Sequence, residues 1–93
     1  MEIRVLQYFL TIAREQSISG AAEFLHITQP TLSRQMKELE EELGKQLFIR
    51  GNRKITLTDD GMLLRKRAEE IIQLVEKTES EMNADTTEFS GDI

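Results

Sequence analysis

Residues 21–36 constrain the fold of this chain more than any other segment. Ala21, Ala22 and Leu25 recur at short helical spacing, a polar stretch follows, and a second run of helical periodicity then begins. Paired alanines favour a close helix crossing, because small side chains let two backbones approach each other. Ser17 and Ser19 are both possible N-caps for the first helix. The pattern predicts a helix-turn-helix unit over about residues 18–37.

The second helix of this unit is the most clearly marked element. Thr28 is a good N-cap, and Pro30 falls in the first turn, where its missing N–H costs no hydrogen bond. Gly44 follows as a C-terminal cap residue. The positions expected to face the core form one aliphatic stripe. They are Leu32, Met36, Leu39 and Leu43.

The opposite face of this helix carries groups that can bind DNA in a major groove. Gln29 offers a bidentate amide to adenine, and Arg34 offers a fork to guanine or a grip on a phosphate. Pro30 or the methyl group of Thr31 can touch a thymine methyl. These four residues are the predicted base contacts.

Phosphate contacts are predicted from the same helix. Thr28, Ser33 and Lys37 supply hydroxyls and an ammonium for the DNA backbone, and the N–H groups at the helix start add to them. Helix capping and packing also explain Thr28 and Ser33, so their DNA roles are secondary. Solvation alone remains an alternative for Arg34 and Lys37.

A two-stranded wing is predicted over about residues 48–57. Gly51 and Asn52 form a turn signal, and residues 54–57 alternate as a strand does. Arg53 at the tip is the candidate for a narrow, A·T-rich minor groove, with Arg50 and Lys54 beside it. Exposed turns often carry charged residues that have no function, which is an alternative for Arg53 and Lys54. For Arg50, a structural ion pair with Glu40 is an equal alternative.

The charge distribution is compatible with DNA, although the net charge is −5. Residues 28–57 hold six basic and four acidic side chains, whereas residues 58–93 hold four basic and ten acidic ones. The acidity therefore lies away from the predicted binding helix. The negative sum predicts modest non-specific affinity for DNA.

A long helix is predicted over residues 59–83, with Thr58 as its cap and Asp59 and Asp60 in its first turn. Apolar positions repeat along it in alternating steps of four and three, which is typical of a coiled-coil seam and predicts a homodimer. The predicted dimer-interface residues are Leu64, Ala68, Ile71, Val75, Thr78 and Met82. Residues 84–93 are polar and turn-rich, so they are predicted to be a linker.

The chain resembles the winged helix-turn-helix DNA-binding domain of the LysR-type transcriptional regulators, followed by their linker helix. The resemblance extends from Phe9 to Gly61. The matching residues are Ala21-Ala22 with Leu25, Thr28-Gln29-Pro30, Ser33-Arg34, residues 39–44, Leu47-Phe48 with Arg50, and Leu57-Thr58 with Gly61. One departure is Asp60, where a small residue is common.

The resemblance implies a mostly α-helical fold: residues 1–58 as the DNA-binding domain, residues 59–83 as the dimerisation helix, and residues 84–93 as a linker to an effector-binding domain that this sequence lacks. It implies a double-stranded operator as partner, a homodimer that can become a tetramer in the full-length protein, and a cytoplasmic regulator. A small-molecule effector would act only through the missing domain.

The composition disfavours other function classes. Without cysteine and with one histidine, the chain offers neither a thiolate nor a recognisable metal cluster, so no metal, cofactor or catalytic residue is predicted. No apolar run approaches the roughly 20 residues that span a bilayer. The remaining rivals are a winged-helix module that binds only protein, and an enzyme, for which no nucleophile or base is found at a useful spacing.

Overall fold

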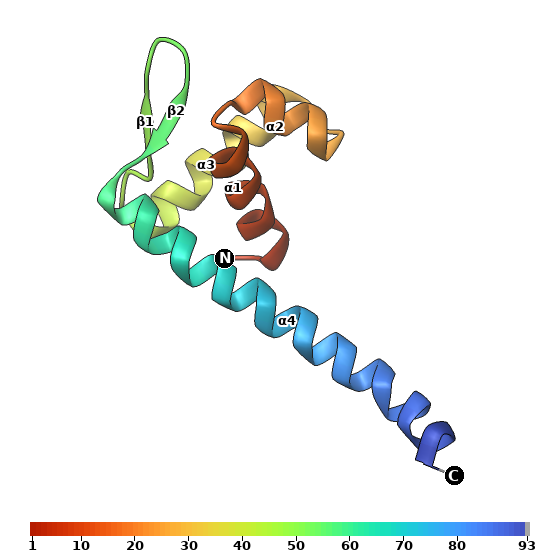
Figure 1. Ribbon diagram of the computed structural model, residues 1–93. Coiled ribbons are helices and arrows are strands. Elements are labelled where there is room, and N and C mark those ends of the chain that lie inside the picture. Colours follow the sequence, from red (N-terminus) through yellow and green to blue (C-terminus); the bar gives the residue numbers. More distant parts are fainter. Residues whose placement is uncertain (93) are drawn as a thin grey trace.

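The computed structural model describes residues 1–92, with side chains for residues 1–84. Three helices come first, a two-stranded antiparallel wing follows, and a long helix ends the described chain (Figure 1). The elements are α1 (Ile3–Glu15), α2 (Ile18–Leu25), α3 (Gln29–Leu43), β1 (Phe48–Arg50), β2 (Ile55–Leu57) and α4 (Asp59–Asp92). The wing and the α2–α3 pair lie at one end of the molecule, and α4 leads away from them. The predicted winged helix-turn-helix fold is confirmed.

Side-chain caps define where α2 and α3 begin. Ser17 caps α2, and its Oγ accepts the Gly20 N–H at 2.9 Å. Thr28 caps α3 in the same way, through the Thr31 N–H at 3.3 Å. Gly44 ends α3 in the left-handed conformation, with φ of 67°. Of the two candidate caps for α2, Ser17 is therefore the one used.

The core lies where α1, α2, α3 and the base of the wing meet. Its fully buried side chains include Phe9 and Ile12 from α1 and Leu32 from α3. Phe9 and Phe48 bring α1 and β1 together, with ring centroids 5.3 Å apart. Each apolar side chain of this size adds roughly 1.5–3 kcal/mol when it leaves water. This shared core fixes the wing relative to the helix-turn-helix unit.

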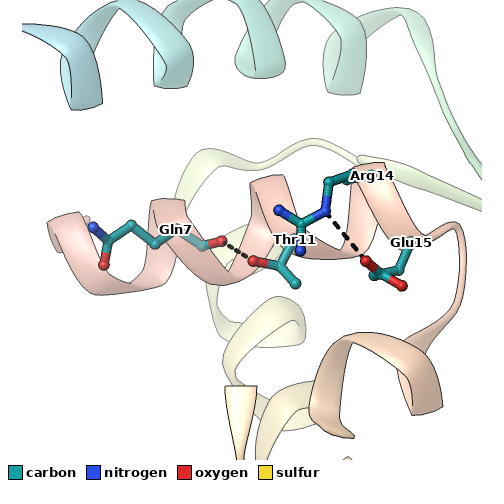
Figure 2. A network of polar contacts seen from close by, with 4 residues as sticks. All are labelled: Gln7, Thr11, Arg14 and Glu15. Carbon is teal, nitrogen blue, oxygen red and sulfur yellow. Dashed lines mark hydrogen bonds and ion pairs between the residues drawn. The ribbon is translucent and has the colours of Figure 1, made fainter. Parts of the chain in front are cut away.

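Helix α1 lies between α4 on one side and the α2–α3 pair on the other (Figure 2). Thr11, a buried polar residue of α1, donates its hydroxyl hydrogen bond to the carbonyl of Gln7 at 2.8 Å, also drawn in Figure 2. The bond satisfies the hydroxyl within its own helix, so its burial carries little cost.

The structure differs from the sequence expectation in three places. Helix α4 continues to Asp92, so residues 84–92, expected to be a polar linker, are helical. Leu43, at the end of the predicted aliphatic stripe of α3, is exposed because the helix runs past the core there. Ile49, whose apolar side chain is expected from the sequence to pack on the core with Leu47 and Phe48, is exposed, because successive side chains of β1 point to opposite faces of the wing. Residue 93 lies outside the described residues.

Candidate nucleic-acid interface

The polar face of α3 is open to solvent, while its opposite face is closed by the core. Leu32, Met36 and Leu39 are buried. The seven predicted contact residues of this helix lie on the open side. Thr28, Gln29, Pro30, Arg34 and Lys37 are exposed, and Thr31 and Ser33 are half-buried. Helix α3 therefore has a buried apolar face and an accessible polar face, as the sequence predicts.

Two of the predicted contacts also build the start of the helix. The Thr28 hydroxyl accepts from the Thr31 N–H and donates to the Thr31 hydroxyl at 2.8 Å. These bonds hold the first turn of α3 in place, with Gln29 and Pro30 presented at its beginning. The capping role predicted for Thr28 is confirmed.

The wing adds three exposed cations, Arg50, Arg53 and Lys54. Its turn is closed by the Gly51 N–H, which donates to the carbonyl of Lys54 at 3.0 Å. None of these three side chains, and neither Arg34 nor Lys37, forms an ion pair with a carboxylate of residues 1–84. Five cations on one end of the molecule thus have their charge available for a polyanion.

Some of these side chains share a cleft of about 770 Å³ between α3 and β1, which we call the α3–β1 cleft. Ser33, Arg34 and Lys37 line it from α3, and Phe48 and Arg50 line it from β1. Ile18, at the start of α2, also lines it. The predicted contacts at the beginning of α3 and at the tip of the wing lie outside this cleft. The predicted contact residues therefore fall into three groups: those that line the cleft, those at the start of α3, and those at the wing tip.

Glu40 has a role that the sequence did not indicate. Its Oε2 accepts the backbone N–H of Leu47 at 2.7 Å, just before β1 begins. The alternative that pairs Glu40 with Arg50 is wrong, because this carboxylate binds the backbone instead. The two partners are seven positions apart in the sequence, across the end of α3, and no periodic pattern in the sequence indicates this contact.

The predicted dimer seam on α4 needs a correction. Ala68 is 0% exposed in a single chain, and Leu64 packs against the core, because α1 covers this side of α4. Ala68 is therefore closed to a second copy, whereas Leu64 stays partly exposed. Ile71 and Val75 are half-buried, while Thr78 and Met82 are exposed. The exposed apolar edge instead includes Leu63, which is 55% exposed, and Leu74, which is 64% exposed.

Within the described residues, His, Cys, Asp and Glu side chains do not gather in any group of three suited to a metal ion. None of the helices over residues 1–92 combines the length and apolar character that a bilayer crossing requires. The cationic end of the molecule is thus the surface with the clearest chemical character.

Comparisons with known proteins find relatives along most of the chain. The family model described as "Bacterial regulatory helix-turn-helix protein, lysR family" matches residues 3–62. The HTH-type transcriptional regulator BsdA of Bacillus subtilis is 48% identical over 94 residues, which cover 100% of this chain and 32% of BsdA. BenM of Acinetobacter baylyi is 44% identical over 77 residues, 83% of this chain and 25% of BenM. The chain spans about a third or less of these curated relatives.

Solved structures are similar over most of the chain. The BenM DNA-binding domain in complex with benA site 1 DNA has a TM-score of 0.88 and 41% identity, over 92% of this chain and 97% of that one. The CbnR DNA-binding domain in complex with DNA has a TM-score of 0.86 and 36% identity, over 92% and 99% of the two chains. Both are crystal structures of a DNA-binding domain in complex with DNA.

Proposed function

Because the chain belongs to the LysR family of bacterial regulatory helix-turn-helix proteins and is a DNA-binding domain of that family, we propose how it binds a double-stranded operator. Helix α3 enters a major groove, and the tip of the wing reaches the adjacent minor groove. Gln29 and Arg34 read base edges, and Arg53 lies in the minor groove. The family consists of transcription regulators, so the enzyme alternative is excluded.

The observation that best supports this arrangement is the division of α3 into two faces. Its aliphatic stripe is buried from Leu32 to Leu39, whereas Gln29, Arg34 and Lys37 are exposed. A winged-helix module that binds only protein needs no such polar face. Bidentate contacts from Gln29 and Arg34 to the bases would each contribute about 1–3 kcal/mol of discrimination.

The test is the Arg34→Ala variant against a duplex recovered by selection from random sequences. We expect a loss of affinity for the selected duplex that exceeds the loss for a random duplex, because a base contact adds to the phosphate term. Fluorescence anisotropy at fixed salt measures both. Arg4→Ala is the matched control, since it removes the same charge from an exposed position on α1. Equal affinities for wild type and Arg34→Ala would remove Arg34 from the site.

We also propose that two copies pair through the exposed edge of α4. This edge carries Leu63 and Leu74, with Ile71 and Thr78 beside them. Helix α4 is basic at Arg65, Lys66 and Arg67 and acidic further on, at Glu76, Glu79 and Glu81. An antiparallel pair brings opposite charges together, whereas a parallel pair opposes like charges. The two α3 helices would then meet two half-sites of a near-palindromic operator.

The remaining parts of the proposal concern the whole protein. We place the regulator in the cytoplasm, where its operator would be. Sensing of a small molecule is assigned to a domain outside this chain, and a tetramer of the full-length protein would also depend on that domain.

A further inference from the structure

Gln16 connects the helix-turn-helix unit to the wing through its backbone. It lies between α1 and α2, and its N–H donates to the carbonyl of Ile12 at 2.7 Å. Its own carbonyl accepts the N–H of Ile55, in β2, at 2.9 Å. The next residue, Ser17, caps α2. A single residue therefore ends α1, leads into α2 and contacts the wing.

The backbone of Gln16 has the left-handed conformation, with φ of 58° and ψ of 28°. A residue with a Cβ atom rarely adopts this conformation, because the Cβ comes too close to the backbone. Such residues persist only where surrounding contacts hold them in place. Gln16 is exposed, and its two backbone hydrogen bonds supply such contacts. The bond to the wing in turn depends on this conformation, since φ and ψ set the direction of the carbonyl.

The bond from Ile55 lies at the end of the strands that is nearer the wing tip. Ile55 is the first residue of β2 and pairs with Arg50, the last residue of β1. Arg53, in the turn, is two residues away from Ile55 along the chain. Other hydrogen bonds hold the base of the wing, where it meets α3 and α4. The Gln16 carbonyl thus fixes the outer part of the wing relative to the start of α2.

Resting on the proposed function, in which α3 enters a major groove and the wing tip enters the adjacent minor groove, we propose that Gln16 is a positioning residue for the wing tip. Its carbonyl holds the tip at a set place relative to the helix-turn-helix unit, so that Arg53 meets the minor groove beside the half-site. A tip that is ordered before binding loses less freedom on binding. Gln16 therefore contributes to the preference for A·T pairs beside the half-site and not to the reading of bases by α3.

Three variants separate the backbone conformation of Gln16 from its side chain. Gln16→Gly removes the side chain but adopts the left-handed conformation readily. Gln16→Val disfavours this conformation, because its side chain is branched at Cβ, and should turn the carbonyl away from Ile55. His26→Val is the matched control. His26 is exposed and has φ of 61°, but its backbone forms no hydrogen bond with residues 48–57 of the described chain.

Binding is measured by fluorescence anisotropy on two duplexes with the same selected half-sites, flanked by A·T pairs in one and by G·C pairs in the other. Wild type and Gln16→Gly should prefer the A·T-flanked duplex to the same degree. In Gln16→Val this preference, the ratio of the two affinities, should fall by about threefold to fivefold, as expected for the loss of one hydrogen bond. Any loss of affinity in His26→Val should be the same on both duplexes.

Amide hydrogen exchange followed by NMR reports on the bond itself. The Ile55 N–H should be protected in wild type and Gln16→Gly and exchange several-fold faster in Gln16→Val, with protection within α3 unchanged. If Gln16→Val does not fold, the bond is tested from its other end. Ile55→Pro removes the N–H, while Ile55→Val, of similar size, keeps it, so only the former should lose the A·T preference.

Equal exchange of the Ile55 N–H in wild type and Gln16→Val would overturn the proposal, as would an equal loss of A·T preference in His26→Val. So would an A·T preference that Arg53→Ala removes but Gln16→Val leaves unchanged. Failure of the proposed function looks different. Wild type would then bind the two duplexes equally and Arg53→Ala would leave their ratio unchanged, although the Ile55 N–H stays protected.

Discussion

The position of Gly61 leaves no room for a side chain. It is buried in the first turn of α4, where a Cβ atom would overlap the backbone carbonyl of Leu47 and lie 3.1 Å from Leu57 Cβ. The same carbonyl accepts the Thr58 N–H at 3.0 Å, so it cannot move without losing a bond. The glycine is thus required by close approach of two backbones, and not by its own dihedral angles.

We predict that Gly61→Ala destabilises the fold by about 1–3 kcal/mol, because the added methyl group must displace backbone. Chemical denaturation monitored by circular dichroism measures the free energy of unfolding. Gly20→Ala is the matched control, since the nearest atom to its added Cβ lies 3.4 Å away and α2 is helical there. That variant should be as stable as wild type or slightly more so. Wild-type stability in Gly61→Ala would contradict the account.

At the scale of elements, the wing is fastened to the helices through backbone groups. The Ile55 N–H donates to the carbonyl of Gln16 at 2.9 Å, which ties β2 to the end of α1. The Thr58 hydroxyl donates to the carbonyl of Gln46 at 2.6 Å, while also accepting the Gly61 N–H. Together with the bond from Leu47 to Glu40, these contacts hold both ends of the wing.

We predict that Glu40→Ala lowers the free energy of unfolding by about 1.5–3 kcal/mol, because the Leu47 N–H loses a charged acceptor in a half-buried place. Glu40→Gln should lose less, since the amide oxygen can still accept. Glu41→Ala, an exposed neighbour, serves as the control. Urea denaturation of the three variants gives the comparison, and equal losses for Glu40→Ala and Glu41→Ala would disprove the role of this bond.

The sequence predicted those parts of the fold that depend on local signals. Thr28, Pro30 and Gly44 mark the ends of α3 through backbone chemistry that acts within a few residues, so the helix and its exposed face could be predicted. Two other features join separate elements: the hydrogen bond between Glu40 and Leu47, and the close approach of Gly61 to Leu47. No local sequence pattern predicts such contacts. The sequence resemblance identified Gly61, but only the structure gives the physical reason.

The side of α4 that is buried within a single chain could not be predicted, because the same residue spacing is expected for a contact inside one chain and for a contact between two chains. Leu64 and Ala68 repeat as a coiled-coil seam would, yet they pack inside one chain. An apolar stripe on a helix shows that this face is buried, but not whether it packs on a helix of the same chain or on a helix of a second chain. At 100° per residue, Leu74 lies about 80° around the helix from this stripe. It is therefore not among the interface residues predicted from the sequence.

At the scale of the whole molecule, the exposed edge of α4 fixes the register of the proposed dimer. A two-fold axis near Leu74 would place Arg67 of one copy opposite Glu81 of the other, since each lies seven residues from Leu74. Within one chain, Arg67 already pairs with Glu70 at 2.8 Å, on the surface of the helix. The antiparallel dimer would extend this pair into a network across the interface.

We predict that Leu74→Asp raises the dimer dissociation constant on the order of 100-fold, because a charge is buried at the axis. Arg67→Glu and Glu81→Arg should each raise it roughly tenfold, as each affects two symmetry-related pairs, and the double variant should recover most of the loss. Sedimentation equilibrium measures the constants. Glu76→Arg, on another face of α4, is the control. A monomeric wild type at high micromolar concentration would rule out the dimer.

The junction at Leu47 has a mechanical consequence for the spacing of an operator. Its N–H donates to Glu40 of α3, and its carbonyl accepts the N–H of Thr58, the cap of α4, so α3, the wing and α4 meet at one residue. These two bonds hold the wing in a fixed orientation relative to α3 and α4. In the proposed dimer, a base pair inserted between the half-sites would therefore be accommodated by twisting and bending of the duplex more than by movement of the wing, at an elastic cost in the DNA.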